Sequence, residues 1–288
     1  MDIFATGMTF GLMMGGILSL TVLGISVVYG ITGVPNFAIG LIGVIGGYTA
    51  WYFTADIGIT LAIFLGIAVC FGIGFLLQII LLTPLSKKGA DATLFFIITI
   101  SLGLILQGLI RIVFPKPQIS IELPRIGNIT IAGVSADGVK FLALAVAVVT
   151  LVLIRFLERN SKFGKMLQGT EQNLKLAKLI GINTSLIFAL SHGIGCSLAA
   201  VGAIFWGSIY SLNLSTGWNL AFTGYIIAVI GGIGNIWGGL LSALVMGFVI
   251  SFAGYFLGGV WQSVVLYSIV ILVLVIRPRG ILGSERSI

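Results

Sequence analysis

Runs of about twenty apolar residues recur along almost the whole chain and constrain its fold more than any other feature. They cover residues 8–30, 37–54, 59–82, 93–113, 139–157, 185–207, 218–233, 236–257 and 259–276. A helix that crosses a hydrocarbon core of about 30 Å needs about 20 mainly apolar residues. We therefore expect an all-α integral membrane protein, a single domain over 1–288 with nine transmembrane helices. Eight is the alternative, with 30–54 partly re-entrant or 218–257 in broken helices.

The composition supports a lipid-facing exterior. Charged residues make up 8% of the 288 residues and hydrophobic residues 58%, and the mean hydropathy is +1.20. A soluble domain carries about 25% charged residues because its surface meets water. This chain is therefore expected in the cell membrane. Its net charge of +7 is typical of basic cytoplasmic loops and does not indicate a nucleic-acid partner.

The placement of the basic residues predicts an orientation. Eleven of the fifteen Lys and Arg lie in three stretches, 84–91, 155–185 and 277–288. The other four lie in 111–140. The positive-inside rule assigns the three rich stretches to the cytoplasm. It places the N-terminus outside, the C-terminus inside and the proline-bearing segment 114–138 in an extracytoplasmic loop, where we expect one short strand pair from Asn128 to Val134.

The cytoplasmic segment 155–185 contains one predicted amphipathic helix. Thr170 is expected to cap its N-terminus, because a hydroxyl can accept from an amide of the first turn. Glu171 then lies where the helix dipole favours negative charge. Gly181 is the expected stop, since glycine tolerates the left-handed conformation that ends many helices.

This helix should present two faces. At 100° per residue, a polar arc is formed by Glu171, Gln172, Lys175 and Lys178. The opposite side is apolar and consists of Leu174, Leu176, Ala177 and Ile180. Such a side needs a partner, which could be the protein's own helices, the lipid headgroups of the membrane or another protein.

Residues for covalent or metal chemistry are scarce, so no cofactor or metal site is expected. The single histidine, His192, lies in an apolar run, as do Cys70 and Cys196. We interpret the cysteines as small buried hydrophobes and His192 as a core or pore-lining residue. The dipeptide Gly164-Lys165 is followed by Met166. It is therefore no phosphate-binding loop, which needs Ser or Thr directly after Gly-Lys. Energy for pumping would have to come from another chain.

The apolar runs contain almost no ionisable side chains. Asp56, Asp91, Arg111 and Glu158 all fall near the ends of runs. Embedded carboxylates normally mark ion or proton relays, so their scarcity argues against an ion-coupled carrier and a charge-lined channel. The embedded polar residues are neutral instead: Asn36, Gln78, Ser101, Gln107 and Gln262. Such groups often join helices by hydrogen bonds.

Two segments resemble each other, one from Asn36 to Tyr48 and one from Asn235 to Gly247. Each begins with Asn after a turn that contains Gly or Pro and continues into a glycine-rich helix. Interrupted apolar segments at matching places in two halves indicate a transport pathway. The alternative is a pair of ordinary, tightly packed helices.

Five pieces of the sequence together resemble the permease subunits of branched-chain amino-acid ABC transporters, of the LivH type. They are spread over nearly the whole chain, at 29–40, 100–107, 163–182, 230–239 and 277–283. The Asn-Phe-x-x-Gly element from Asn36 to Gly40 favours this type over its M-type partner. Ile39 and His192 depart from the usual pattern, and the Glu-Ala-Ala triplet of the coupling segment is incomplete.

The resemblance implies a heteromeric importer with this chain as a non-enzymatic permease subunit. The expected partners are an M-type permease subunit, two ATP-binding cassette ATPases and an extracytoplasmic substrate-binding protein. ATPase coupling would fall to Thr170, Glu171, Leu174, Ala177, Ile180 and Gly181. The translocation pathway would include Asn36, Gly40, Gln107, His192 and Asn235. Alternatives are a permease for urea, short amides or other small solutes, a passive channel working alone and, with no candidate residues, a membrane enzyme.

Overall fold

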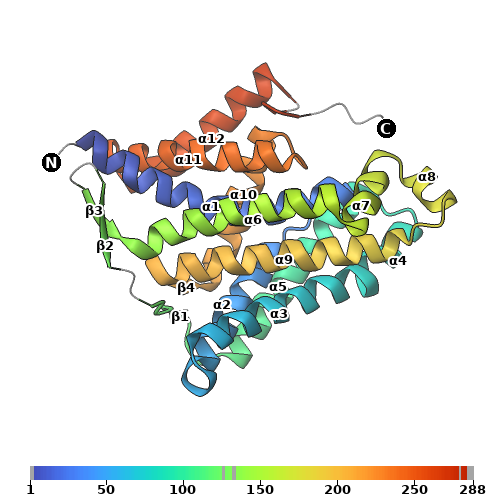
Figure 1. Ribbon diagram of the computed structural model, residues 1–288, viewed down its shortest axis with the longest axis horizontal. Coiled ribbons are helices and arrows are strands. Elements are labelled where there is room, and N and C mark those ends of the chain that lie inside the picture. Colours follow the sequence, from blue (N-terminus) through green and yellow to red (C-terminus); the bar gives the residue numbers. More distant parts are fainter. Residues whose placement is uncertain (1–2, 125–126, 132–133, 279, 284–288) are drawn as a thin grey trace.

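The computed structural model describes residues 3–124, 127–131, 134–278 and 280–283. Arg125, Arg279 and Arg286, counted above, lie outside the described residues. The helices are α1 (Ile3–Thr32), α2 (Ile39–Ile57), α3 (Ile59–Leu77), the π-helical turn η1 (Gln78–Leu82), α4 (Thr83–Lys87), α5 (Ala92–Val113), α6 (Gly138–Asn160), α7 (Lys162–Gln172), α8 (Leu174–Leu179), α9 (Thr184–Ile209), α10 (Leu214–Gly231), α11 (Ile236–Phe256) and α12 (Gly259–Ile276). The long helices form a bundle, with β2 and β3 at one end and α7 and α8 at the other (Figure 1).

Eight helices of the described residues are long and apolar enough to cross a membrane. They confirm a multi-span helical membrane fold. The ninth long helix, α2, has 19 residues but is not among the eight, because Thr, Tyr, Trp and Asp dilute its apolar residues. Its first twelve residues are almost all buried against α3, α9 and α10. Most of the polar residues lie in its last seven residues, from Trp51 to Ile57, where the helix is partly or fully exposed.

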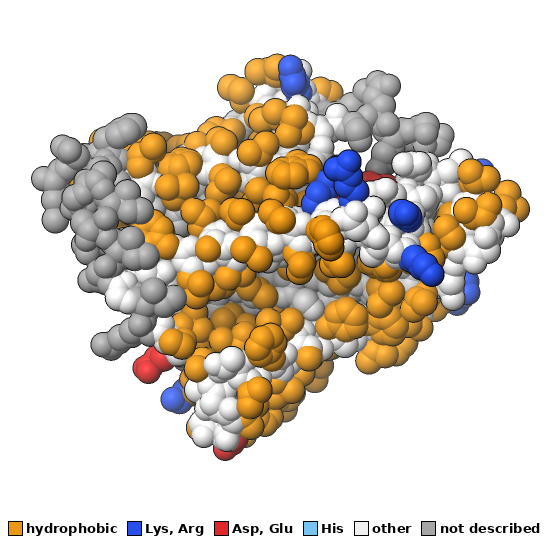
Figure 2. All heavy atoms as spheres, viewed as in Figure 1, with side chains coloured by type: hydrophobic (Ala, Val, Ile, Leu, Met, Phe, Trp, Pro, Cys, Tyr) orange, Lys and Arg blue, Asp and Glu red, His pale blue; other side chains and the backbone are white. Residues whose placement is uncertain are grey.

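The helices differ in how much of their surface meets other helices. The apolar stretch of α1 is 89% buried, whereas that of α12 is 6% buried. The central helix α9 packs on both α1 and α2, while α5, α6 and α12 lie at the periphery. Figure 2 shows apolar side chains over much of the molecular surface. In water such a surface would be unstable, so it is expected to face lipid or other subunits.

Small residues allow the central helices to approach closely. A Cβ on Gly43 of α2 would lie 2.7 Å from the carbonyl oxygen of Ala199 in α9. Gly24 of α1 and Gly195 of α9 approach each other through their backbones in the same way. Membrane helices associate largely through packing of this kind, since lipid removes the hydrophobic driving force between them.

Two short strand pairs lie in the connections. The expected pair is confirmed and is longer than predicted: β2 (Asn128–Ile131) pairs antiparallel with β3 (Val134–Asp137). A second pair was not predicted. In it, β1 (Gln118–Ile119) pairs with β4 (Leu212–Asn213) and ties the 114–138 segment to the turn between α9 and α10.

Candidate functional site

The helix α10 contacts several of the residues predicted to line a pathway. It begins with a capping box in which Asn213 Oδ1 accepts from the amide of Thr216 at 2.9 Å. The apolar run predicted at 218–233 begins four residues after the first residue of this helix, Leu214, because the polar first turn lowers the local hydropathy. Three of the five predicted pathway residues, Asn36, Gly40 and Gln107, lie against α10.

Asn36 lies in the turn before α2 and is fully buried. Its amide donates to the hydroxyl of Tyr225 in α10 at 2.6 Å, and its Oδ1 accepts from the amide of Ala38 at 3.1 Å. The ring of Phe37 stacks on Tyr225 with 4.3 Å between centroids. Within the described part of the chain, the amide nitrogen Nδ2 of Asn36 has no hydrogen-bond partner. The turn before α2 is therefore fixed to α10 by its backbone.

Gly40 and Gln107 reach α10 from two other helices. A Cβ on Gly40 would collide with the carbonyl oxygen of Gly217, so α2 and α10 cross at backbone contact. On α5, Gln107 Oε1 accepts from the indole nitrogen of Trp218 at 2.9 Å. Sequence reasoning did not identify Trp218 or Tyr225. With Phe222 they follow the i, i+4, i+7 spacing of one helix face, which is the signal that could have found them.

His192 and Asn235 lie elsewhere. His192 is fully buried in α9, where its Nδ1 is 3.3 Å from the carbonyl oxygen of Phe188. Asn235 caps α11, because its Oδ1 accepts from the amide of Gly238 at 3.0 Å. Its Nδ2 donates to the carbonyl of Leu282 at 2.7 Å. Asn235 thus holds the C-terminal segment against the α10–α11 turn. Neither residue lines the two cavities along α10.

Those two cavities differ in chemistry. One, here called the aromatic cavity, has a volume of about 500 Å³ and lies at the helix ends near α7. Its aromatic residues are Tyr29, Phe37, Phe96, Phe222 and Tyr225. The other, called the polar cavity, has a volume of about 230 Å³ and lies between α10 and α12, further towards the opposite end. Its polar lining includes Asn219, Thr223, Gln262, Ser263 and Tyr267.

The predicted coupling helix is in fact two helices, and three details of the prediction are wrong. Thr170 is not a cap: it lies inside α7, and its hydroxyl donates to the carbonyl of Met166 at 2.8 Å. Glu171 is consequently in the last turn of α7, not the first turn of a helix. The break falls at Asn173, whose backbone is extended and whose Oδ1 caps α8 by accepting from the amide of Leu176 at 2.9 Å.

The end of α8 and its apolar side agree with expectation. Gly181 has φ +84°, and the amide of Ile182 donates to the carbonyl of Ala177 at 3.0 Å, which is the Schellman arrangement. Ala177 is buried, whereas Leu179 and Ile180 are 83% and 68% exposed. Leu174 and Leu176 are exposed as well. Of the predicted apolar side, Leu174, Leu176 and Ile180 are therefore open within this chain, whereas Ala177 is covered.

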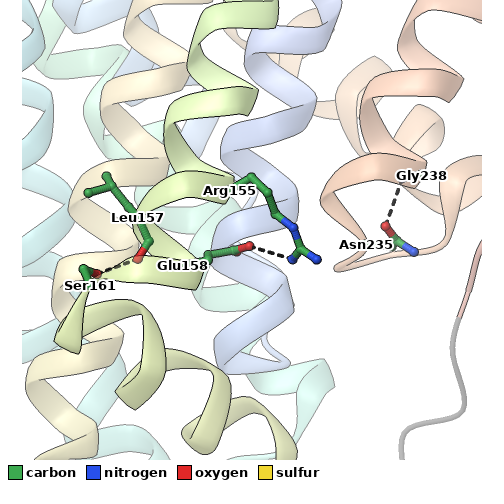
Figure 3. A network of polar contacts seen from close by, with 6 residues as sticks. All are labelled: Arg155, Leu157, Glu158, Ser161, Asn235 and Gly238. Carbon is green, nitrogen blue, oxygen red and sulfur yellow. Dashed lines mark hydrogen bonds and ion pairs between the residues drawn. The ribbon is translucent and has the colours of Figure 1, made fainter.

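A third cavity, of about 220 Å³ and distinct from the two along α10, separates α6 and α7 from the start of α11. Arg155 and Glu158 on α6 form an ion pair at 3.2 Å, and Arg155 extends towards Asn235 (Figure 3). Glu171 and Gln168 of α7 line the same space. This junction, defined by Arg155, Glu158, Gln168, Glu171 and Asn235, places the coupling segment beside the α10–α11 turn.

The described residues give no support for metal chemistry. Among them, no three His, Cys, Asp or Glu side chains gather in a group that could hold a metal ion. Both cysteines are free and buried, as predicted. The thiol of Cys70 donates to the carbonyl of Ile42 at 3.0 Å, which is a packing role.

A bundle of apolar helices with cavities along an inner helix and an exposed amphipathic segment at one end defines a membrane transport protein. A family model described as "Branched-chain amino acid transport system / permease component" matches residues 7–274. The chain belongs to this family of permease components, and as a transport subunit of ABC systems it is not an enzyme.

Curated relatives match over nearly the full length. The chain is 31% identical to the high-affinity branched-chain amino acid transport system permease protein BraD of Pseudomonas aeruginosa, over 95% of this chain and 94% of the relative. It is 27% identical to LivH of Escherichia coli K12, over 97% and 96%. A chain of PsaBC from Streptococcus pneumoniae, solved in complex with Fab, is 16% identical with a TM-score of 0.50, covering 94% of this chain and 91% of that one. That likeness concerns the fold alone.

Proposed function

We propose that this chain forms half of the translocation pathway of an ATP-driven importer for branched-chain amino acids, with α10 lining the passage. The observation that carries the proposal is the convergence of Asn36, Gly40 and Gln107 on α10. Two cavities follow the same helix. The substrate follows from the names of the relatives, BraD and LivH, which are branched-chain amino acid permeases.

The coupling segment, α7 and α8, is proposed to dock into an ATPase subunit. Its support is the exposed row of apolar side chains formed by Leu176 and Leu179 of α8 and by Ile180, its C-cap. A short helix binds in a groove through apolar anchors spaced at i, i+3 and i+4. The junction that contains Arg155, Glu158 and Asn235 would transmit its movement to the α10–α11 turn. Association with other ABC components follows from the family, and the proposed set is an M-type permease, two ATPases and a binding protein.

The end that holds α7 and α8 is proposed to be cytoplasmic. Lys and Arg side chains gather near that end of the surface in Figure 2, in agreement with the positive-inside rule. The N-terminal end of α1, with β2 and β3, lies at the opposite end of the bundle (Figure 1). The extracytoplasmic binding protein would then meet the 114–138 segment.

The test is leucine uptake into proteoliposomes that contain the chain, its M-type partner and the ATPases, with a loaded binding protein supplied at the extracytoplasmic face and ATP at the face of the ATPases. The double variant Leu176→Ser/Leu179→Ser should lower ATPase binding and uptake by at least about tenfold, because each buried Leu contributes roughly 1.5–3 kcal/mol. The matched control Lys175→Ser/Lys178→Ser changes the polar arc and should stay within about twofold. Equal effects of the two doubles would contradict the docking surface, and uptake without nucleotide would favour a passive channel.

A further inference from the structure

The polar cavity contains a group of polar side chains that do not pair with one another. Asn219 and Thr223 come from α10, and Gln262, Ser263 and Tyr267 come from α12. Within the described residues, none of these five side chains makes a hydrogen bond, whereas Gln107, an amide in a similar apolar run, is paired with Trp218. The five groups therefore share an unused set of donors and acceptors around one space of about 230 Å³.

The position of this cavity makes unpaired groups costly. Both α10 and α12 have 18 residues and are about 27 Å long at 1.5 Å per residue. Thr223 and Tyr267 lie about halfway along them. At that depth lipid offers no hydrogen bonds, and an unpaired polar group costs roughly 1–3 kcal/mol or more. The cavity is consequently expected to hold water or a polar solute rather than lipid tails.

The two walls of the cavity have different chemistry. The polar lining comes from α10 and α12, whose amides and hydroxyls can both donate and accept, although Leu220 and Leu266 of the same helices also line the cavity. The facing wall is apolar and includes Met14, Leu18 and Ile250. Among the described residues, no charged side chain lines the cavity, so a solute with a net charge would find no counter-charge there. A net-neutral molecule with one polar end and one aliphatic end matches both walls.

The local structure keeps the amide of Gln262 in this space. Its nitrogen Nε2 lies where a Cβ on Gly254 of α11 would be. Glycine at 254 therefore leaves the room that this amide occupies, beside the cavity and not extended towards lipid. Asn219 lines the same cavity from α10.

We propose that the polar cavity binds a zwitterionic α-amino acid with an aliphatic side chain during its passage, with Asn219 and Gln262 as the residues that hold its amino and carboxylate groups. This assignment rests on the proposed function of the chain as a permease. The apolar wall formed by Met14, Leu18 and Ile250 would receive the aliphatic side chain. Urea and short amides lack that part and would gain nothing from half of the cavity.

Cysteine accessibility tests whether the cavity is open to water and solute. Ser263→Cys places a thiol in its lining, and Ser268→Cys places one on exposed α12 surface outside it. The native Cys70 and Cys196 are buried and give little background. In the assembled transporter, a membrane-impermeant methanethiosulfonate should modify Ser263→Cys roughly tenfold faster or more, because the reactive thiolate forms only in water. Leucine-loaded binding protein should slow that reaction, whereas unloaded binding protein should not.

Equal, slow modification of both cysteines would overturn the proposal, because the cavity would then be filled by lipid or covered by the partner subunit. A fast reaction that leucine does not slow would overturn it too, leaving a water-filled space without a solute site.

Transport variants test the roles of the two amides. Asn219→Leu and Gln262→Leu should each lower leucine uptake by roughly tenfold to a hundredfold, the effect of one lost hydrogen bond to a charged group. Ser101→Ala is a control on α5, where the hydroxyl bonds only its own helix, to Ile97 at 2.9 Å, and uptake should be unchanged. If the unmodified complex takes up no leucine, the proposed function fails. If it does, and both amide variants match it, the assignment of this cavity alone fails.

Discussion

Replacing Gly40 by alanine tests the contact between α2 and α10 on which the proposed pathway depends. The added Cβ would collide with the carbonyl oxygen of Gly217 and lie 2.9 Å from the Cβ of Ala221 and 3.0 Å from its amide nitrogen. Two of these three atoms are backbone, so no side chain can rotate away. Carbon atoms pack at about 3.5–4.0 Å, and the helices must therefore separate by more than about 0.6 Å.

The size of the effect follows from known costs of overpacking. Such insertions destabilise by about 1–3 kcal/mol, and in a chain of this size each kcal/mol lowers Tm by about 2–4 °C. We expect Gly40→Ala to lower the Tm of the purified subunit by roughly 5 °C. It should also reduce uptake, because the separation of α2 from α10 shifts the turn that contains Asn36.

Gly72→Ala in α3 is the matched control, since a Cβ there meets nothing within 4 Å. Alanine is the better helix former by about 1 kcal/mol, so this variant should keep or slightly raise the Tm. Thermal unfolding in detergent, followed by intrinsic tryptophan fluorescence, measures both variants. Identical Tm values for the two would refute the argument that backbone contact at Gly40 holds α10 in place.

Three smaller changes give further tests. Trp218→Phe removes the bond to Gln107 and should cost about 0.6–1.5 kcal/mol; in a double-mutant cycle, adding Gln107→Leu should recover part of that cost, and strict additivity would argue against the bond. Gly181→Ala forces a non-glycine residue to φ +84°, and a cost of about 1–2 kcal/mol should speed hydrogen exchange at the amide of Ile182 roughly fivefold to thirtyfold. Arg155→Gln breaks an ion pair whose arginine side chain is 55% exposed, so stability should change by less than about 1 kcal/mol, and any change should shrink at high salt.

The positions of most long helices could be predicted from the sequence because hydropathy is a local property. The apolar run 93–113 corresponds to α5, and 259–276 coincides with α12. The coupling segment was predicted less well, as a single helix. There the side chain of Asn173 competes with the helix by capping the next turn, which hydropathy does not register. Asparagine is a preferred N-cap, so the signal was present at that position.

The candidate site depended on contacts between distant parts of the chain. Gly40 meets Gly217, and Asn36 meets Tyr225. Each pair is separated by well over a hundred residues, so no local period relates its members. The glycine-rich stretch from Asn36 indicated close packing, as the sequence suggested. It did not identify α10 as the neighbouring helix.

Gln107 and Gln262 separate what the two levels determine. The sequence by itself established that both are neutral amides in apolar runs of a membrane protein, because composition and hydropathy fix the surrounding solvent. Tertiary structure alone decided their roles. Gln107 is paired with Trp218 of α10 at 2.9 Å, whereas Gln262 lies against Gly254 and faces an open cavity. The difference comes from which helix packs opposite each amide, and that is a property of the assembled bundle.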